Sequence, residues 1–490
     1  MLMSRNNSTS PRPYLERAAA VLAALPSEVT QLGATFQAAG HDLALVGGPV
    51  RDAFLGRTAT DFDFTTSAPP EVTEEILATW GQATWDIGRA FGTIGAKKTT
   101  SSGNLVVEVT TYRSDAYDPT SRKPAVQFGR TLTGDLSRRD FTVNAMAVRL
   151  PTLEFVDPFD GLSDLVKGRL RTPIEPEESF GDDPLRMMRA ARFVAQLGFD
   201  IDPLAAEAMS AMAQRITICS AERVRDEFTQ LILADRPRPG IDVLVQSGLA
   251  DHIIPELPAL QLEIDEHHHH KDVYEHSLTV LEQAIGMETG PDGPVPRPDL
   301  VLRLAALLHD IGKPATRRLE PDGRVSFHHH ELVGARLVTK RLRALRYDKE
   351  TVAAVARLTE LHLRFHGYAD SGWSDAAVRR YVTDAGPLLE RLHRLTRSDC
   401  TTRNRRFAER LAFAYDDLER RIAELAEAEE LARVRPDLDG NQIMTLLGIG
   451  PGPVVGEAYR FLLDLRMEHG PLGPEVAAEH LKAWWTERQD

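Results

Sequence analysis

The sequence lacks the features that mark secreted and membrane proteins. It contains only two cysteines, Cys219 and Cys400, in 490 residues, too few for a disulfide framework and not spaced as a zinc site. It has no run of about 18 apolar residues, so we expect no transmembrane helix. The first residues, MLMSRNNSTSPRP, are polar and contain no apolar signal-peptide core. These absences favour a cytoplasmic protein.

An excess of positive charge is also missing. The chain has 58 Lys and Arg against 72 Asp and Glu, a formal net charge of −14. Net charge describes solubility better than it describes a local binding face, so nucleic-acid binding is not excluded. Basic residues nevertheless form three groups along the chain. For the second and third of them, a solvated helix face is as good an explanation as a nucleic-acid contact. The groups are Arg186, Arg189 and Arg192; then Arg336, Lys340, Arg341, Arg343 and Arg346; then Arg403, Arg405, Arg406 and Arg410.

Hydrophobic residues make up 42% of the chain, enough to build large cores, and the length is typical of about three domains. Short apolar strands, expected at 43–46, 61–64, 92–98 and 104–112, alternate with helices up to about residue 160. The pattern beyond is helical. We therefore expect an α+β protein with a disordered tail at 1–12, a mixed α/β head at 13–160, a helical module at 161–262, a histidine-rich module at 263–401 and a helical tail at 402–490.

Two aspartates in the expected strand 61–64 are the first candidates for catalysis. Asp61 and Asp63 are two residues apart, and side chains at that spacing share one face of a strand. Adjacent carboxylates repel unless a cation neutralises them, and Mg²⁺ prefers oxygen ligands together with substrate phosphates. Glu108, in the expected strand 104–112, has the alternation required of a third acid. Acids in an exposed loop without function are the alternative for the aspartate pair.

The residues upstream favour a nucleotide site. Gly47 and Gly48 stand between a strand and a short helix, where glycine lets backbone N–H groups approach phosphate oxygens. Arg51 follows within reach of a triphosphate. The combination GG-x-x-R-D, followed by D-x-D ten residues after Arg51, is far more specific than a glycine pair alone.

Five segments resemble the motifs of class II tRNA nucleotidyltransferases and bacterial poly(A) polymerases, in the family's order. The first is LVGGPVRD at 45–52 with LGR at 55–57 and DFD at 61–63. The others are RRDFTVNAMA at 138–147, DPFDG at 157–161, DDPLR at 182–186 and AERV at 221–224. The resemblance extends over about 40–260. It implies a polymerase-β-type nucleotidyltransferase head followed by an all-α neck, body and tail.

The same resemblance implies roles for these residues. Asp61 and Asp63 would hold two Mg²⁺ ions, one activating the RNA 3′-hydroxyl and the other neutralising the triphosphate and the leaving pyrophosphate. Glu108 would be the third acid. The Gly47–Gly48 backbone, Arg51 and Arg139 would contact the incoming nucleotide.

Asp183, Arg186, Arg189 and Arg192 form the expected base-reading face. They recur every three residues, so they share one broad face of a helix. An acceptor and a planar donor one turn apart imitate a Watson–Crick edge, and the family uses such a pair to select CTP or ATP without a template. A salt-bridged helix is the alternative for the arginines. The chain departs from the family pattern at Asp182, where Glu is usual, and at Pro49.

A histidine-rich segment marks a second site. Eleven of the sixteen histidines lie between His267 and His366. Within it His309-Asp310, in the sequence HDIGK, ends an apolar helix that Asp299 would cap at its start and Gly312 at its end. We expect His267 to His270 to be mostly surface residues.

With His276 and Asp399, the His309-Asp310 pair resembles the HD metal-dependent phosphohydrolase superfamily. His330 and His362 occupy places where that superfamily has further ligands or phosphate contacts, so the resemblance implies an inserted all-α HD domain. Imidazole and carboxylate ligands suit a divalent transition metal as well as Mg²⁺, so the metal stays open. Phosphatase or 2′,3′-cyclic phosphodiesterase activity, or a vestigial or regulatory fold, is what the resemblance implies.

The leading prediction is template-independent addition of CCA from CTP and ATP to the 3′ end of tRNA. Addition of CC or A alone, or of poly(A), stays open because it would depend on a flexible loop, expected within 80–104, and on the grip on RNA. An HD phosphohydrolase that uses the head only to bind RNA is the alternative from another class, against which the intact Asp61 and Asp63 argue. We expect no membrane partner, and the oligomeric state stays open.

Overall fold

The computed structural model describes residues 10–58, 61–86, 88–100, 103–116, 125–261, 272–368, 372–402, 404–429 and 435–489. Residues 1–9 of the expected tail and His267 to His270 lie outside this set, and the first helix begins at Arg12. Within the described ranges, no helix is long and apolar enough to cross a membrane. The chain divides into two compact units, Met1–Pro255 and Glu256–Asp490, which are described separately.

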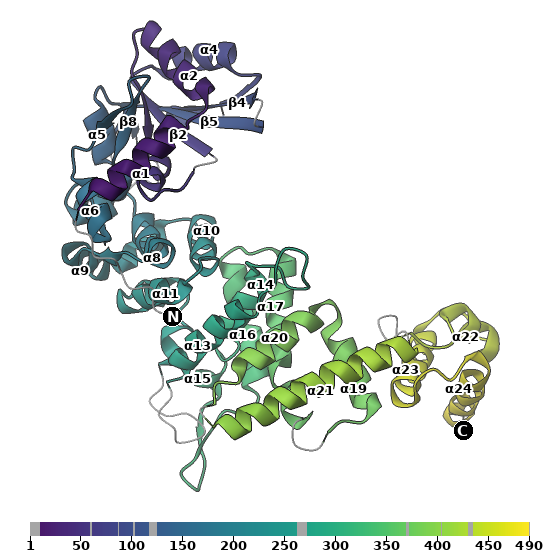
Figure 1. Cartoon of the computed structure of the whole chain (residues 1–490). Helices are drawn as coiled ribbons and strands as arrows, with labels where there is room; N and C mark the ends of the chain where they lie inside the picture. Colours follow the sequence, from purple (N-terminus) through teal and green to yellow (C-terminus); the bar gives the residue numbers. More distant parts are fainter. Residues whose placement is uncertain are drawn as a thin grey trace. The chain divides into compact units, whose positions relative to one another are not determined.

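A seven-stranded sheet in the order β3-β4-β5-β2-β1-β8-β9 organises the first unit (Figure 1). Only β2 and β5 run parallel; the other neighbours in the sheet are antiparallel. β1, β2, β4 and β5 confirm the sequence prediction, whereas β3, β8 and β9 were not predicted. The bounds are β1 Leu43–Val46, β2 Asp61–Thr66, β3 Ala83–Trp85, β4 Thr93–Thr100, β5 Gly103–Thr111, β8 Ala147–Leu150 and β9 Glu154–Val156.

Alternation along β2 and β5 gives the sheet one apolar and one polar face. Phe62 and Phe64 are buried while Asp63 between them is exposed, and Val107 and Val109 flank an exposed Glu108 in the same way. Helices α2 (Ser27–Ala38) and α4 (Pro70–Trp80) carry the apolar residues that complete this core. The remaining elements of the head are α1 Arg12–Ala23, α3 Gly48–Phe54, the hairpin β6 Arg113–Ala116 and β7 Ala125–Phe128, and α5 Leu132–Ser137.

Helices replace the sheet after Gly161, as the sequence predicts. Helix α8 (Leu185–Leu197) is the centre of this part, because most of its residues are buried. A side chain at Gly240 of α11 would lie 2.4 Å from the Ala191 carbonyl, so α11 packs directly on the backbone of α8. The other helices are α6 Gly161–Lys167, α7 Pro176–Asp182, α9 Pro203–Met212, α10 Ala221–Ile232, α11 Pro237–Gln246 and α12 Leu249–Ile253.

The described residues of the second unit are helical apart from one short hairpin. The Asp299 side chain accepts the Leu302 amide at 2.7 Å and caps α14, as predicted. The expected end at Gly312 is wrong, because α14 stops at Leu308 and Gly312 precedes α15. The elements are α13 Val273–Gly286, α14 Leu300–Leu308, α15 Lys313–Thr316, β12 Arg318–Leu319, β13 Val325–Ser326, α16 His330–Ala344, α17 Lys349–Leu361, α19 Asp375–Ala385 and α20 Leu389–Asp399.

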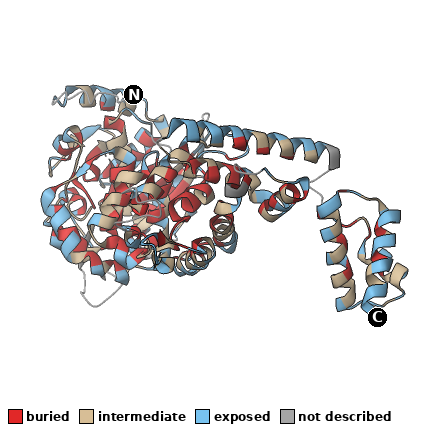
Figure 2. Ribbon diagram, turned by 90° about the horizontal axis from the view of Figure 1, so that it is seen from below, coloured by how far each residue is buried: buried red, intermediate tan, exposed pale blue. Residues whose placement is uncertain are grey.

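The last helices of the unit have a core of their own. Figure 2 shows the helices near the C-terminus with buried residues on the faces turned toward one another and exposed residues outside. That core contains Ile443, Leu462 and Leu481. The helices of this core are α22 Gly440–Leu447, α23 Pro453–His469 and α24 Pro474–Gln489, and residues 448–452 separate α22 from α23. The long helix α21 Arg405–Glu429 precedes them and packs on α19 and α20 instead.

Candidate active sites

The sheet brings two of the predicted acids side by side. Asp63 on β2 pairs in register with Glu108 on the parallel strand β5, so both side chains leave the same face of the sheet. Both residues are exposed. Asp61 is the first residue of β2, two positions before Asp63, and its side chain is outside the part that the structure describes. The polar face of the head therefore carries an acidic pair.

The predicted glycine turn lies next to two arginines. Gly47 has a φ of 74°, which favours glycine, and it directly follows β1, the other neighbour of β2. A Cβ at Gly47 would lie 3.1 Å from a terminal nitrogen of Arg139, and one at Gly48 would lie 3.7 Å from Arg51. The Arg139 Nε atom is buried without a hydrogen-bond partner. A phosphate at this turn would therefore meet backbone amides and two guanidinium groups.

Arg51 is connected through the second motif to α8, the helix that carries most of the predicted base-reading residues. It donates to the Asn144 side-chain oxygen at 2.8 Å, and the Asn144 amide donates to Asp140 at 3.0 Å. Arg189 of α8 forms an ion pair with Asp140 at 2.6 Å. Burial by itself raises the pKa of Asp140, but the Arg189 guanidinium and the hydrogen bonds outweigh it and lower the pKa to about 2.

Phe193 of α8 is the centre of this network, and the sequence did not single it out. Arg192 lies 4.6 Å from the ring centroid, Arg51 5.4 Å and Arg189 5.5 Å. Glu227 of α10 balances part of the charge, 3.2 Å from Arg192. Phe193 is next to Arg192 in the sequence, but only the fold brings Arg51 to the same ring.

The predicted base-reading pair is split between other partners. Asp183 accepts Arg223 at 2.9 Å, so the fourth motif and the fifth meet here. Arg186 is buried and donates to the Ser179 hydroxyl at 2.8 Å and to the Arg138 carbonyl. In this conformation Arg186 binds a hydroxyl and carbonyl oxygens, whereas Arg189 forms the ion pairs of the salt-bridged alternative, with Asp140 and Glu227.

The third motif has a structural role. Asp157 accepts the Gly161 amide at 2.7 Å and the Leu162 amide at 2.9 Å, so it holds the start of α6. Asp164, three residues beyond the motif, is buried between Arg169 and Arg171 and accepts the Thr142 hydroxyl at 2.7 Å. This acid links α6 to the second motif.

The second predicted site forms where helix ends converge. His309 follows the last residue of α14, His362 follows that of α17, and Asp399 is the last residue of α20. His276 and His330 lie in the first turns of α13 and α16. All six predicted residues of this site therefore come together. They lie in or directly after five helices, and only His309 and Asp310 share one.

Asp310 is shared between two sets of ligands. Its Oδ2 atom lies 3.2 Å from His309 Nε2 and 3.6 Å from His276 Nε2, whereas its Oδ1 atom lies 3.2 Å from His330 Nε2 and 3.8 Å from His362 Nε2. Asp399 lies 2.9 Å from His276 Nε2 and so extends the first set. His276, His309 and Asp310 form one group with the spacing of metal ligands, and Asp310, His330 and His362 form another.

Hydrogen bonds at the far side of three imidazoles aim their Nε2 atoms at this centre. The Nδ1 atoms of His309, His330 and His362 lie 2.9, 2.8 and 2.6 Å from carbonyl oxygens three residues earlier. A proton on Nδ1 leaves the Nε2 lone pair for a ligand bond. The Nε2 atoms of His330 and His362 are buried without a hydrogen bond of good geometry, as expected of metal ligands.

The charges favour a cation at the centre. Burial alone lowers the pKa of His309, but Asp310 and Asp399 outweigh it and raise the pKa to about 10. Burial lowers the pKa of His362 to about 3. The two carboxylates therefore stabilise positive charge at this centre. A divalent ion would supply that charge in place of the His309 proton.

Close backbone packing around Gly312 explains why the HDIGK segment requires glycine at this position. A Cβ there would lie 2.1 Å from the His330 carbonyl oxygen and 2.7 Å from the Gly334 amide nitrogen. The turn after Asp310 thus touches the backbone of α16, and this contact places His330 beside Asp310.

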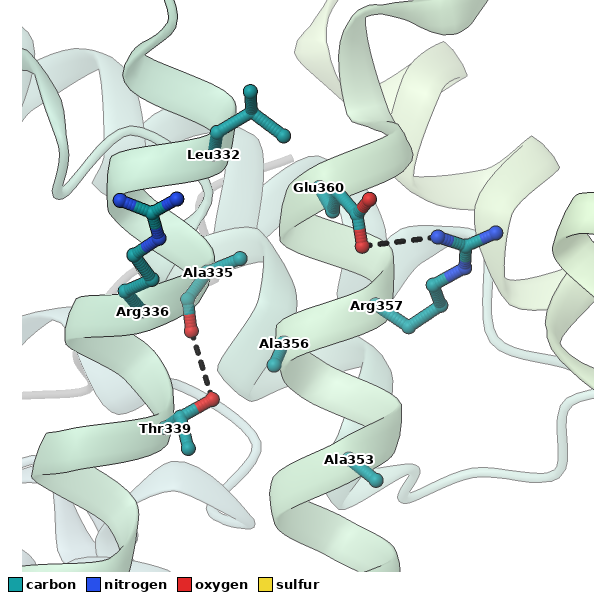
Figure 3. A pocket seen from close by; sticks show the side chains of 8 residues that line it. All are labelled: Leu332, Ala335, Arg336, Thr339, Ala353, Ala356, Arg357 and Glu360. Atoms are coloured by element: carbon teal, nitrogen blue, oxygen red, sulfur yellow. Dashed lines mark hydrogen bonds and ion pairs between the residues drawn. The ribbon is translucent and has the colours of Figure 1, made fainter.

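A cavity of about 550 Å³ between α16 and α17 is separate from these ligands (Figure 3). Leu332, Arg336, Arg357 and Glu360 belong to its lining, and Arg357 is bound to Glu360 at 2.9 Å. None of the predicted site residues lines it. Arg341 of the same basic group is bound to Glu256 at 2.8 Å, whereas Lys340 and Arg343 are exposed.

Three family models match the chain in succession. Residues 43–171 match the poly A polymerase head domain, residues 198–260 match the probable RNA and SrmB-binding site of polymerase A, and residues 273–404 match the HD domain. The acidic pair and the glycine turn lie in the first match and the HD cluster in the third, whereas residues 183–193 fall between the first match and the second.

Two curated relatives match nearly the whole length of the chain, and a third matches about half of it. An A-adding tRNA nucleotidyltransferase of Deinococcus radiodurans is 35% identical over 453 residues, covering 91% of this chain and 96% of the relative. A CC-adding tRNA nucleotidyltransferase of Thermus thermophilus is 32% identical, covering 90% and 93%. A CCA-adding enzyme of Streptococcus suis is 38% identical over 245 residues, covering 49% and 58%.

Solved structures share the fold. The CCA-adding enzyme of Bacillus stearothermophilus in complex with CTP matches with a TM-score of 0.63 at 22% identity, covering 94% of this chain and 98% of that chain. The Thermotoga maritima CCA-adding enzyme with tRNA matches with a TM-score of 0.58 at 16% identity, covering 97% and 98%.

Proposed function

The chain belongs to the tRNA nucleotidyltransferase family, and from that premise we propose that it adds CCA from CTP and ATP to the 3′ end of tRNA without a nucleic-acid template. One observation carries this proposal: Asp63 and Glu108 pair on the exposed face of the sheet, and the strand on the other side of Asp63 leads to the Gly47–Gly48 turn. We also propose a cytoplasmic location, because the relatives that match most of the chain are tRNA nucleotidyltransferases.

The residues of the head fit a divalent ion. Asp63 and Glu108 offer carboxylate oxygens side by side, and Asp61, on the same strand, would add a third acid. Oxygen ligands of this kind suit Mg²⁺. When bound, Mg²⁺ would neutralise phosphate charge and favour ionisation of the RNA 3′-hydroxyl.

The chain's own groups would hold the nucleoside triphosphate. The Gly47–Gly48 backbone has no side chain to keep phosphate oxygens away, and Arg139 carries a buried donor without a partner. Arg51 brings a second guanidinium and is fixed by Asn144 at 2.8 Å. Charge-assisted bonds from two arginines would orient the triphosphate toward Asp63.

Asp183 and Arg186 would select the base. Cytosine and adenine both offer an exocyclic amino donor next to a ring-nitrogen acceptor, and uracil and guanine reverse this order. A carboxylate beside a guanidinium matches the first pattern and rejects the second. To read a base in this way, Asp183 must release Arg223 and Arg186 must release Ser179. Both side chains would then bind the nucleotide. Arg189 and Arg192 would keep the helix fixed during this exchange.

The number of nucleotides added is tested directly by product length. The protein would be incubated with Mg²⁺, CTP, ATP or both, and tRNA ending at the discriminator base or after CC. Growth by CCA on the first tRNA and by A on the second supports the proposal. Growth of the first tRNA by CC alone would indicate a CC-adding enzyme. Growth of the second tRNA by A, with none of the first, would indicate an A-adding enzyme, and long A tails would indicate a poly(A) polymerase. Absence of any incorporation overturns nucleotide addition.

The HD cluster supports a second candidate function, hydrolysis of a phosphate ester such as a 2′,3′-cyclic phosphate at an RNA end. The two ligand sets that share Asp310 carry this proposal. His276, His309, Asp310 and Asp399 would hold one divalent ion, and His330 and His362 a second one through the other Asp310 oxygen. Bound ions would polarise the phosphoryl group. Lys313, 3.0 Å from Asp310, would attract the phosphate into the site.

This second function is tested on tRNA that ends in a 2′,3′-cyclic phosphate, with Mn²⁺, Ni²⁺, Co²⁺, Zn²⁺ or Mg²⁺ supplied in turn. Ring opening by the wild type and its loss in Asp310→Asn support the proposal. Hydrolysis that survives Asp310→Asn rejects the cluster as its source. A Asp63→Asn variant that retains hydrolysis but loses transfer excludes the alternative in which the head only binds RNA.

A further inference from the structure

A cavity of about 480 Å³ opens on the head with Glu108 in its lining, and the proposed function gives no role to its other lining residues. Its lining includes Trp85, Phe91, Thr93, Gly95, Glu108 and Arg113. We infer that this cavity holds the 3′-terminal nucleotide of the RNA that is being extended, with Trp85 and Phe91 as the surfaces on which its base stacks. The inference rests on the proposed nucleotide addition and identifies where the acceptor end is held.

A row of paired residues connects the cavity to the acidic pair. Trp85 on β3 faces Gly95 on β4, and Gly95 faces Glu108 on β5. Glu108 in turn faces Asp63 on β2. Paired residues point to the same face of a sheet, and neighbouring strands are about 4.8 Å apart. Gly95 is thus about 10 Å from Asp63, a span that one nucleotide bridges between its base and its 3′-hydroxyl.

Gly95 provides the seat of the Trp85 ring. A Cβ at Gly95 would lie 2.1 Å from Cε2 of Trp85 and 2.2 Å from its Nε1. The indole therefore lies directly over the Gly95 backbone and leans toward Glu108, instead of standing away from the sheet. Any other residue at this position would push the ring off the row.

Aromatic exposure is concentrated around the same edge. Phe91 is 49% exposed, although it is an apolar residue, and it lines the cavity together with Glu108. Phe128, which is 51% exposed, adjoins it, because a Cβ at Gly92 would lie 2.9 Å from the Phe128 ring. Exposed rings of this kind stack on the bases of single-stranded RNA.

The position of the cavity suits the acceptor and not the triphosphate. Phosphoryl transfer needs the attacking oxygen and the leaving oxygen roughly in line, so the two substrates approach the acids from opposite sides. The Gly47–Gly48 turn follows β1, on one side of β2, whereas the cavity spans β3, β4 and β5 on the other side. Arg113, on the cavity wall, would pair with a phosphate of the RNA.

The test uses the full chain and tRNA that carries 2-aminopurine as its terminal base. Stacking on an aromatic ring quenches this base. We expect quenching with the wild type and its loss in Trp85→Leu and Phe91→Leu. In the same variants the KM for tRNA should rise roughly tenfold, with the KM for CTP unchanged. Trp85→Phe should restore both signals, and Phe413→Leu, which changes an exposed ring of α21, should leave them as in the wild type.

Gly95→Ala gives an independent check, because it displaces the Trp85 ring without removing it. Loss of quenching in this variant supports the seat. Full quenching in both Trp85→Leu and Phe91→Leu, or a rise confined to the KM for CTP, overturns the inference. These outcomes are separate from failure of the proposed function, in which the wild type itself would transfer no nucleotide to tRNA.

Discussion

Asp63 and Glu108 face one another across the parallel strands β2 and β5. The two acids are far apart in the sequence, and the register alone makes them neighbours. Phe62 and Phe64 anchor Asp63 from below because both are buried. The buried rings therefore fix the position of the acidic pair. Because the two carboxylates repel each other, this exposed face favours binding of a cation.

Replacement of these acids should separate chemistry from binding. Asp63→Asn should reduce single-turnover CMP transfer by about a thousandfold, because a lost metal ligand costs several kcal/mol in the transition state. Glu108→Gln should cost less, about ten- to a hundredfold. Affinity for tRNA, measured by filter binding, should not change. Glu75→Gln, an exposed acid of α4, is the control; equal losses in all three variants would contradict the assignment.

Phe193→Leu should weaken nucleotide binding, because the ring meets Arg51, Arg189 and Arg192. Each contact of this type contributes roughly 0.5–1 kcal/mol. We expect the KM for CTP and ATP to rise severalfold with tRNA affinity unchanged. Phe199→Leu is the matched control, since Phe199 is also buried in this unit. A similar KM in the two variants would show that the ring matters only for packing.

The sequence predicted the parts of the molecule that are local. The D-x-D pair, the strands around it and the HDIGK segment are read from neighbouring residues, and the structure contains each strand. Register is different, because it depends on how distant strands slide past one another. The pairing of Trp85 with Gly95, and of Gly95 with Glu108, has no trace in the spacing of these residues.

Shared partners were also beyond sequence patterns. The motif containing Asp140 and Asn144 was recognised, but its contact with Arg51 crosses 93 positions. The three-residue spacing of Asp183 and Arg186 predicts a common helix face. In the structure, however, Arg186 is buried and donates a hydrogen bond to the Ser179 hydroxyl at 2.8 Å. A spacing rule gives the direction of a side chain and not the competition among its possible partners.

The HD cluster should bind a pair of transition-metal ions per chain. In an Asp63→Asn background, which removes the head site, metal content after dialysis against Mn²⁺ can be measured by plasma mass spectrometry. His276→Ala and His362→Ala should each leave one ion, and Asp310→Asn should leave none, because both ligand sets use Asp310. His329→Ala is the control, since its side chain is 78% exposed. A single ion in the wild type, unaffected by His362→Ala, would reject the second set.

Gly312→Ala should disable the HD site alone. The added methyl group would lie 2.1 Å from the His330 carbonyl oxygen, a distance that forces α16 away from Asp310. We expect loss of metal and of hydrolysis, with nucleotide transfer unchanged. Gly286→Ala is the control, because nothing lies within 4 Å of the added group. Normal metal content in Gly312→Ala would show that the turn tolerates the shift.

Acid should remove the stability that Asp140 provides. The pKa of Asp140 is lowered to about 2 in the folded chain, where Arg189 and hydrogen bonds outweigh burial. A lowered pKa means that the carboxylate stabilises the fold above its unfolded pKa of about 3.9 and that this contribution disappears as pH falls toward 2. The contribution at neutral pH is on the order of 2 kcal/mol.

Urea unfolding of the full chain and of Asp140→Asn measures this contribution. The difference between their midpoints should be constant from about pH 7 to pH 5 and should shrink as pH falls toward 3. Glu207→Gln, which changes an exposed acid of the same unit, should follow the wild type throughout. A difference that stays constant down to pH 3 would mean that the amide disrupts packing instead of removing a charge. In that case the link from Arg189 through Asp140 to Arg51 would be steric and not electrostatic.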